Sequence, residues 1–506
     1  MSNHLIDGLL ANADPLATFA KLKNGTAYSY RSIFELSAQL ANALVNCGVA
    51  KGDRVAVQAP KSVEAAMLYI ACARMGAVFL PLNTAYTAQE VRYFLDDASA
   101  KLFICDPASS EALKPIAEEC GSRLETLGVP GESKDSGSFF ALAQTMQPTF
   151  ENAACGPDDL AAILYTSGTT GRSKGAMLSH DNLLSNARAL TDFWRFTSDD
   201  VLLHALPIFH THGLFVALNV VMCSGASLIF LPAFNNDDVI DALPAATSMM
   251  GVPTFYTRLL NDDRFSADLV SHIRLFVSGS APLLAETHVQ FEQRTGMRIL
   301  ERYGMTETNM NTSNPYDGER RAGTVGFPLP GTQLRIADPD TGQELPQGEV
   351  GVIEVKGPNV FSGYWNMPEK TAEEFRKDGF FITGDLGKID KENYVHIVGR
   401  AKDLIISGGY NIYPKEIELL LDDQPGVLES AVIGVAHPDF GEGVVAVIVP
   451  SDPDFDPAKT LETIKSQIAR FKQPKHIEVL KELPRNTMGK VQKNVLRENL
   501  KGVFNA

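Results

Sequence analysis

The stretch AAILYTSGTTGRSKGAM, residues 161–177, runs from a strand-like apolar segment into a loop of glycines, hydroxyl side chains and cations. Gly168 and Gly171 carry no Cβ atom, so the backbone N–H groups beside them can approach an anion closely. The polar members of the loop are Thr166, Ser167, Thr169, Thr170, Arg172 and Lys174. Phosphate suits such donors, so the stretch predicts a phosphate-binding loop and not a plain linker. It is not a Walker A loop, because G-x-x-x-x-G-K-[S/T] is matched nowhere in the chain.

Helical and strand-like periodicities alternate along the first part of the chain. The segments with helical periodicity are 30–48, 62–76 and 87–97, the last with a capping box of Thr87 and Glu90. The strand-like segments are 53–59, 77–82, 101–105, 200–207, 226–232, 247–253 and 273–280. Such β-α-β alternation builds parallel sheets with helices on both faces, so the chain predicts an α/β fold with two sheets.

The pattern changes twice toward the C-terminus. From about residue 320 to 400, short strands alternate with Gly/Pro turns, which predicts a small antiparallel barrel or sheet. After Arg400 come strands near 403–407, 429–435, 444–450 and 476–480, and helices near 414–423, 459–470 and the chain end. This mixture indicates a small α+β unit. We place the boundary at GRAKD, 399–403, which divides the chain into domains 1–399 and 400–506.

Composition limits the classes of function. At 506 residues the chain exceeds what one hydrophobic core supports, and its net charge of −16 argues against general binding to nucleic acid or membranes. No apolar run approaches the roughly 18 residues of a spanning helix, and the opening MSNHLIDGLLANADPL lacks the basic region of a signal peptide. The six cysteines show no metal-binding spacing. We therefore expect a soluble protein of the cytoplasm with reduced thiols.

Positive charge concentrates near the C-terminus. From Lys459 to Lys501, eleven Lys and Arg residues accompany four acids, whereas residues 402–456 hold two Lys and eleven acids. A solvated basic face and a local site for a polyanionic ligand are both compatible with this asymmetry.

Seven short motifs follow one another along nearly the whole chain. They are YTSGTTGRSKG (165–175), LPIFHTHGL (206–214), SGSAPL (278–283), ERYGMTET (301–308), FITGD (381–385), GRAKDLIISGGYNIYPKEIE (399–418) and PRNTMGK (484–490). This order resembles the adenylate-forming superfamily, which includes acyl-CoA synthetases, luciferases and the adenylation domains of peptide synthetases. Within it, the wording of 164–183, 205–217, 251–260 and 301–318 most resembles the malonyl-CoA synthetases.

The resemblance implies both a fold and a reaction. The fold is a large domain with two doubly wound, mostly parallel sheets and a small β-barrel, followed by a small α+β domain on a hinge. The enzyme is an ATP-dependent, AMP-forming acid–thiol ligase with Mg2+ as cofactor. Malonate and ATP would give malonyl-adenylate and pyrophosphate, and CoA would then give malonyl-CoA and AMP. Methylmalonate is a further candidate acid.

The first step brings a carboxylate against the α-phosphate, so a cation that bridges the two anions would stabilise the transition state. We assign this role to Lys490, in a Gly-flanked loop of the basic segment, and the resemblance indicates the same residue. Thr306 is expected to donate to the α-phosphate, and Glu307 to bind Mg2+, which prefers oxygen ligands. Acylation of Lys490 would remove its charge and switch the enzyme off.

The motifs also imply the rest of the nucleotide site. The loop residues Thr166 to Gly171, with Lys174, would bind the β- and γ-phosphates. Asp385 would accept both ribose hydroxyls with Arg400 beside it, and Tyr303 would stack on adenine. The remaining nucleotide contacts are expected from Gly279, Ser280, Ala281, Pro282, Glu301, Arg302, Gly304 and Met305.

Malonate would bring a second carboxylate into the site, where its charge must be paired. Arg258 in GVPTFYTRLL offers the fork that suits a carboxylate, although an ordinary helix-surface arginine is the alternative. His210 would hydrogen-bond the reacting acid or gate the pocket, and Ser278 and Met305 would line the same wall. His210 and His212 resemble a metal motif, but no third ligand follows at a suitable spacing.

The second step requires Lys490 to withdraw so that the thiol can approach. The resemblance marks Lys402 as the hinge for this rotation. Ser407, Gly408 and Gly409 would then face the pantetheine arm, and Arg470 and Lys472 would meet the CoA phosphates.

Three alternatives stay open. The acid is another short carboxylic acid; or the chain is an adenylation module that loads a carrier protein; or it is a luciferase-type oxidoreductase. Thioester formation with CoA, or light emission with oxygen, discriminates the last of these. The oligomeric state and an earlier removal of a targeting segment are also left open.

Overall fold

The computed structural model describes residues 2–131, 135–166, 173–407, 410–452, 455–465, 467–486 and 489–504. Six residues of the predicted phosphate loop, Ser167, Gly168, Thr169, Thr170, Gly171 and Arg172, lie outside the described residues, as do Gly408 and Gly409. The chain forms two compact units. Unit 1 comprises Met1–Gln333 and Val355–Phe381, and unit 2 comprises Leu334–Glu354 and Ile382–Ala506.

The first sheet of unit 1 has six strands in the order β6-β5-β3-β4-β7-β8. The strands are β3 Arg54–Gln58, β4 Val78–Pro81, β5 Leu102–Cys105, β6 Arg123–Thr126, β7 Leu160–Thr166 and β8 Lys174–Ser179. All neighbours from β6 to β7 are parallel, and only β8 runs antiparallel to β7. The helices between and around them are α2 Tyr30–Asn46, α3 Val63–Met75, α4 Ala88–Ala98, α5 Ser110–Glu119 and α6 Ser138–Gln144.

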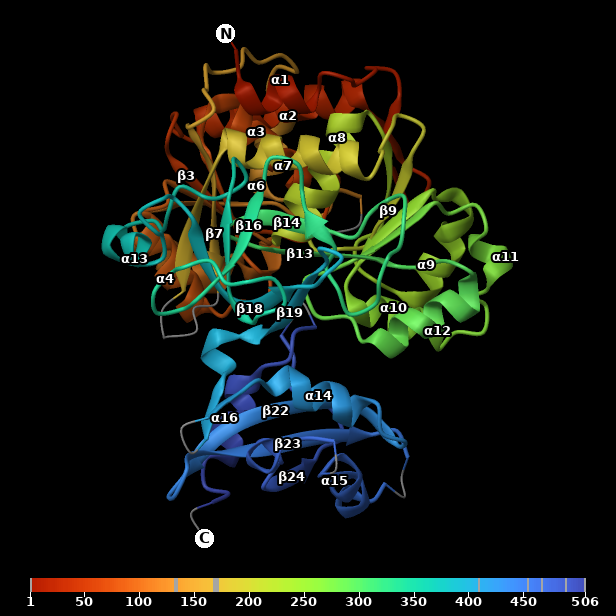
Figure 1. Ribbon diagram of the computed structural model, residues 1–506. Coiled ribbons are helices and arrows are strands. Elements are labelled where there is room, and N and C mark those ends of the chain that lie inside the picture. Colours follow the sequence, from red (N-terminus) through yellow and green to blue (C-terminus); the bar gives the residue numbers. More distant parts are fainter. Residues whose placement is uncertain are drawn as a thin grey trace. The chain divides into compact units, whose positions relative to one another are not determined.

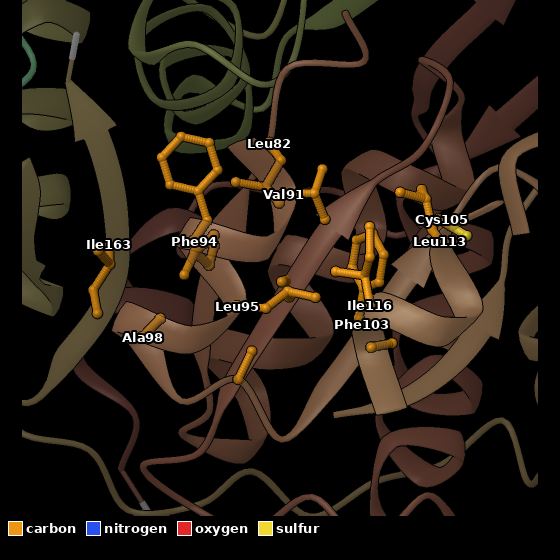
Figure 2. Close-up of a cluster of buried hydrophobic side chains, with 14 of the residues drawn as sticks. Leu82, Val91, Phe94, Leu95, Ala98, Phe103, Cys105, Leu113, Ile116 and Ile163 are labelled. Atoms are coloured by element: carbon orange, nitrogen blue, oxygen red, sulfur yellow. The ribbon is translucent and has the colours of Figure 1, made fainter. Parts of the chain in front are cut away.

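Helices α4 and α5 cover one face of this sheet. Figure 2 shows Phe94 and Leu95 of α4 with Leu113 and Ile116 of α5, gathered against Phe103 of β5. Full burial of side chains of this size contributes about 1.5–3 kcal/mol each. Local signals set the helix ends: the predicted capping box at the start of α4 is present, and α3 ends at a glycine with φ of +75°.

The second sheet of unit 1 has nine strands in the order β15-β14-β13-β12-β11-β9-β10-β1-β2. The strands are β1 Thr18–Leu22, β2 Ala27–Ser29, β9 Val201–His204, β10 Ser227–Phe230, β11 Ser248–Gly251, β12 Leu275–Ser278, β13 Leu300–Met305, β14 Asn309–Ser313 and β15 Phe327–Pro328. In the run β13-β12-β11-β9-β10-β1, each strand is parallel to the next. The antiparallel pairs, β1 with β2 at one end of the sheet and β13 with β14 and β14 with β15 at the other, lie at the two edges.

Short helices follow the strands of this sheet, as Figure 1 shows for the group from α9 to α12. The α-helices are α1 His4–Leu9, α7 His180–Phe193, α8 Asn219–Ser224, α9 Asn236–Ala242, α10 Pro253–Leu260, α11 Ala267–Val270, α12 Ala285–Thr295 and α13 Pro368–Glu373. The 3-10 turns are η1 Pro107–Ser109 and η3 Leu243–Ala245, and η2, His212–Leu218, is a π-helix. The predicted α/β organisation with two mostly parallel sheets is confirmed.

Unit 2 holds most of a four-stranded sheet, ordered β16-β17-β18-β19, where the sequence predicts a small barrel or sheet. Its strands are β16 Gln333–Ala337, β17 Gly351–Lys356, β18 Phe381–Ile389 and β19 Val395–Arg400. The five-stranded sheet that follows contains β20 Ile405–Ser407, β21 Tyr410–Ile412, β22 Val427–His437, β23 Gly441–Pro450 and β24 His476–Val479. Its helices and turns are η4 Ala401–Asp403, α14 Pro414–Asp422, α15 Pro457–Lys465, η5 Arg470–Lys472 and α16 Lys493–Leu500.

Strand β23 is apolar from residue 443 to its end because both of its faces are covered. Val444, Ala446 and Ile448 face one buried cluster with α14 and α15, whereas Val445 and Val447 face a second cluster with α16. Because successive side chains point to opposite faces, a strand covered on both sides needs apolar residues at every position.

The six cysteines are free thiols, in agreement with the expectation from the sequence. Within the described parts of the chain, none of the helices combines the length and apolar character that crossing a bilayer requires.

Candidate functional site

The motif residues of unit 1 gather at the carboxyl ends of parallel strands. In the register of the nine-stranded sheet, Ser278 at the end of β12 lies between Gly251 of β11 and Glu301 of β13. Open parallel sheets bind ligands outside the carboxyl ends of their strands. The sheet therefore brings SGSAP, ERYGMTE and the start of α10 together at the carboxyl ends of its strands, although they are far apart in sequence.

The SGSAP turn packs tightly at this edge. A Cβ atom on Gly279 would lie 2.3 Å from Cζ of Arg302, so any other residue there would displace the Arg302 guanidinium. Ser280 has φ of +72°, and its Oγ lies 3.3 Å from Nδ1 of His212. The turn thus holds its backbone against the side chains of Arg302 and His212. Ala281 is half-buried and Pro282 is exposed.

Arg302 is a buried cation. The residue is 4% exposed, and its Nε and Nη2 have no hydrogen-bond partner among the described residues. Burial lowers the pKa of Arg302 to about 9. Because an unpaired buried guanidinium costs folding free energy, its donors indicate a site for an anion.

Two neutral groups of the same region also lack partners within the described residues. They are Nε2 of His212, which is close enough to Arg302 to feel its charge, and Oγ of Ser278, the residue before Gly279. Burial, followed by Arg302 and His210 nearby, places the pKa of His212 well below its ordinary value, so this imidazole is neutral. Unpaired buried polar groups of this kind are rare in folded proteins. The cluster of Arg302, His212 and Ser278 is therefore able to bind a small anion with hydrogen-bonding oxygens.

Arg258, the residue that sequence reasoning favours for the second carboxylate, lies on α10 at the protein surface. It is exposed on α10, with its Cζ 5.8 Å from the ring centroid of Phe234. It lines an open pocket with Phe234 and Asn261. Tyr256, two positions earlier, points the other way and donates its hydroxyl to the carbonyl of Val277 at 2.6 Å. Residues two apart on a helix face different directions.

The end of β13 presents further predicted contacts. Tyr303, Met305 and Thr306 are half-buried, which leaves part of each side chain open to a ligand. A Cβ atom on Gly304 would lie 1.9 Å from the carbonyl oxygen of Asn309, where the pairing with β14 shifts register. His210, in the loop before η2, is also half-buried.

The two described ends of the phosphate loop lie opposite each other, because Thr166 of β7 pairs with Lys174 of β8. Nζ of Lys174 lies 2.9 Å from Oε1 of Glu374 and 4.1 Å from the ring centroid of Tyr364. Neither Tyr364 nor Glu374 belongs to a motif that the sequence analysis used.

Glu307, the predicted Mg2+ ligand, is buried near this pair. Its Oε1 accepts a hydrogen bond from the hydroxyl of Tyr364 at 3.0 Å, and burial raises the pKa of its carboxyl. Mg2+ is commonly held by one or two carboxylates together with substrate phosphates. A carboxylate beside the loop that would bind phosphates fits this ion.

Unit 2 carries the predicted ribose pair. Asp385 of β18 lies opposite Arg400 of β19, and Nε of Arg400 is 3.0 Å from Oδ1 of Asp385. The Asp385 side chain is buried, and its backbone N–H donates to Oγ1 of Thr383. Two strands thus place the carboxylate in a defined orientation.

Lys490 lies at the end of a tight turn. Its N–H donates to Oδ1 of Asn486 at 2.9 Å, and Gly489 has φ of +74°. Burial and then the charge of Arg400 lower the pKa of Lys490, Asp385 opposes them, and the resulting pKa is about 8. The ammonium group therefore lies among the charges of the predicted ribose pair.

Lys402 lies in η4, directly after Arg400. Burial and the charge of Arg400 lower the pKa of Lys402. The residue that the resemblance marks as the hinge is therefore an exposed lysine next to a second cation, Arg400.

The basic segment pairs with the acidic segment of the same unit. The ion pairs are Lys472–Glu416 at 2.7 Å, Lys493–Glu418 at 2.5 Å, Arg497–Asp403 at 2.7 Å and Arg485–Glu429. Part of the charge asymmetry is thus neutralised within unit 2. Of the predicted CoA contacts, Ser407 ends β20, Lys472 carries the pair with Glu416, and Arg470 is exposed.

The fold and the motif residues identify the protein family to which the chain belongs. The family model described as AMP-binding enzyme matches residues 11–365, and the model of the AMP-binding enzyme C-terminal domain matches residues 416–490. The chain belongs to this family.

Individual similar proteins carry more specific names than the family does. A malonate–CoA ligase of Arabidopsis thaliana is 36% identical over 488 residues, which are 90% of this chain and 79% of that protein. The crystal structure of ATP-bound MatB from Rhodopseudomonas palustris is 56% identical, covers 100% of both chains and has a TM-score of 0.97. A medium-chain fatty-acid–CoA ligase of Escherichia coli (strain K12) is 31% identical and covers 94% of this chain and 86% of its own.

Sequence reasoning missed two features of the site. It assigned Arg302 to the nucleotide and did not anticipate that Nε and Nη2 of this buried guanidinium have no hydrogen-bond partner among the described residues. It gave no role to Tyr364 or Glu374.

Proposed function

We propose that this enzyme joins malonate to CoA and converts ATP to AMP and pyrophosphate. The support is the similarity to a malonate–CoA ligase and to MatB over nearly the whole chain, together with the motif order. In the first step an oxygen of malonate bonds to the α-phosphorus and the bond to the β-phosphate oxygen breaks. In the second step the CoA sulfur bonds to the acyl carbon and AMP leaves.

The observation that carries the choice of a dicarboxylate is the buried Arg302 with two unpaired donors. We assign the second carboxylate of malonate to this guanidinium, with Ser278 and His212 as hydrogen-bonding neighbours. A carboxylate would satisfy Nε and Nη2 together, in the fork geometry that arginine favours. Arg258 is the second candidate, and its exposure makes it the weaker partner.

The other roles follow the motif residues. Lys490 bridges the carboxylate and the α-phosphate, Thr306 donates to that phosphate, and Glu307 holds Mg2+, which would neutralise phosphate charge. His210 orients the reacting acid. A rotation at Lys402 between domains 1–399 and 400–506 then withdraws Lys490, so that Ser407 to Gly409, Arg470 and Lys472 meet CoA. Acylation of Lys490 would stop the first step.

The test is a CoA-dependent assay with malonate, methylmalonate, succinate, acetate and propionate, which measures AMP and ADP separately. We expect AMP and pyrophosphate, with malonate as the best acid. Release of ADP would overturn the adenylate mechanism. An enzyme that uses acetate or propionate as well as malonate would overturn the assignment of the dicarboxylate.

A further inference from the structure

The segment FSGYWNMPEKTAEEF, residues 361–375, lies along the strand that follows the phosphate loop. The N–H of Met177 in β8 donates to the carbonyl of Gly363 at 3.0 Å, and the N–H of Trp365 donates to the carbonyl of Gly175 at 2.7 Å. The segment therefore extends the edge of the six-stranded sheet at β8, and its backbone position is fixed relative to that strand.

This backbone places two side chains against Lys174 of β8. The Tyr364 ring lies under the ammonium at 4.1 Å, and Glu374 accepts from Nζ at 2.9 Å. Oε2 of Glu374 also bonds to the Tyr364 hydroxyl at 2.7 Å, so the three side chains form a closed arrangement. The side chains of Lys174 and Glu374 are 17% and 20% exposed, so solvent screens this pair less than a surface pair.

The same tyrosine reaches the predicted metal ligand. Its hydroxyl lies 3.0 Å from Oε1 of Glu307 and 2.7 Å from Oε2 of Glu374. The Tyr364 N–H donates to Oγ1 of Thr371, which restrains the main chain at this point. Tyr364 thus connects Glu307, the expected Mg2+ ligand, with the pair of Lys174 and Glu374.

We propose that Glu374 and Tyr364 are positioning residues that hold the Lys174 ammonium ready for the β- and γ-phosphates of ATP. This inference rests on the proposed function, because it takes Lys174 as a phosphate ligand. A lysine has four flexible bonds and three N–H donors. Glu374 uses one donor and Tyr364 covers one side, which leaves donors for phosphate oxygens. Restraint before binding increases affinity because less conformational entropy is then lost.

The chain provides a matched control one residue away. Glu373 is the last residue of α13, and Glu374 follows it as the C-cap. Both carboxylates pair with Lys370, at 3.0 Å for Glu373 and 3.2 Å for Glu374, and the Glu373 side chain is 67% exposed. Replacing Glu373 or Glu374 by glutamine changes the net charge equally. A difference between the two variants therefore reports the contacts of Glu374 with Lys174 and Tyr364 and not the overall charge.

The experiment measures the Kd of the full-length protein for ATP with Mg2+ by calorimetry, without malonate so that no adenylate forms. We expect Glu374→Gln to weaken ATP binding about tenfold, as for loss of a hydrogen bond to a charged group. Tyr364→Phe, which keeps the ring, is expected to weaken ATP binding less, and Glu373→Gln to leave it unchanged. In steady-state assays, KM for ATP rises and KM for malonate stays constant. Equal ATP affinities of Glu374→Gln and Glu373→Gln would overturn the inference.

Lys174→Met separates this inference from the proposed function. If Lys174→Met weakens ATP binding, and Glu374→Gln has no further effect in that background, Glu374 acts through Lys174 as proposed. Additive effects would overturn the positioning role and leave Lys174 as a phosphate ligand. An unchanged ATP affinity in Lys174→Met itself would overturn both the phosphate role of Lys174 and the inference. Glu374→Asp, with the charge kept on a shorter arm, should recover part of the lost affinity; no recovery relative to Glu374→Gln would contradict an ion-pair mechanism.

Discussion

Replacement of Arg302 by methionine should make the empty enzyme more stable and remove its preference for malonate. Methionine is unbranched and apolar and fills irregular buried space well. The Arg302 residue is 4% exposed, and its Nε and Nη2 lack partners among the described residues. The variant therefore exchanges a buried, unsatisfied cation for an apolar side chain.

The gain in stability follows from the pKa of Arg302. Burial lowers this pKa to about 9, well below the ordinary value of an arginine, and one pKa unit corresponds to about 1.4 kcal/mol, so the charged form costs at most about 5 kcal/mol. Apolar replacement of buried ionic groups typically stabilises by about 1–4 kcal/mol, which is the range we expect. The unfolded chain holds the proton more tightly. The penalty is therefore complete below about pH 9 and becomes smaller as the pH rises above that value.

The loss of malonate activity has a separate magnitude. Truncating one partner of a buried, hydrogen-bonded charge pair costs about 2–5 kcal/mol. In kcat/KM for malonate this corresponds to a reduction of about 30-fold to several thousandfold. Acetate and propionate have no second carboxylate, so their kcat/KM should stay the same or rise.

Two measurements check Arg302→Met. Thermal unfolding with and without malonate should show a higher Tm for the empty variant and a smaller shift on adding malonate than in the unmodified enzyme. Initial rates of AMP release over the acid panel should show the selective loss. An equal loss with all acids, or a malonate kcat/KM within about threefold of the original, would refute the pairing of Arg302 with the second carboxylate.

Further predictions concern the other charged residues. Lys490→Ala should reduce adenylate formation by about 10²–10³-fold while preformed malonyl-adenylate still yields the thioester, and an equal fall in both half-reactions would contradict the assignment. Because burial lowers the pKa of Lys490 to about 8 and only the ammonium attracts the two anions, kcat/KM for ATP should fall as the pH rises above about 8. Malonyl-adenylate thiolysis should not share this limb, and a pH profile that is unchanged in Lys490→Ala would refute it. Arg258→Leu should reduce kcat/KM for malonate less than Arg302→Met does, since Arg258 is exposed; the reverse order would exchange their roles. Asp385→Asn should raise KM for ATP with little change in KM for malonate, and an unchanged KM for ATP would contradict the ribose assignment.

Local elements were predictable because their causes lie within a few residues. The Thr87–Glu90 capping box starts α4, and the apolar run of β23 reflects burial on both faces. The helix expected over residues 459–470 corresponds to α15, which ends at Lys465, with the turn η5 after it. Helix ends are the least certain part of such a prediction, because flanking tertiary contacts decide them.

The choice between Arg258 and Arg302 could not be made from the sequence. Arginine is rarely buried unless it is paired, so a sequence places both residues on the surface. The proposal of Arg302 rests on the register of β11, β12 and β13, which sets Ser278 between Gly251 and Glu301, and on the packing of Arg302 against the SGSAP turn.

The sequence by itself determined the α/β class, the order of the motifs and the types of residue that would hold a nucleotide, because periodicity, turn chemistry and motif spacing are properties of neighbouring residues. Only the tertiary structure decided which charges meet. Lys174 and Glu374 are separated by 200 positions in the chain yet lie 2.9 Å apart. Such a contact depends on strand register and sheet edges that form when distant segments pack, and no local pattern encodes it.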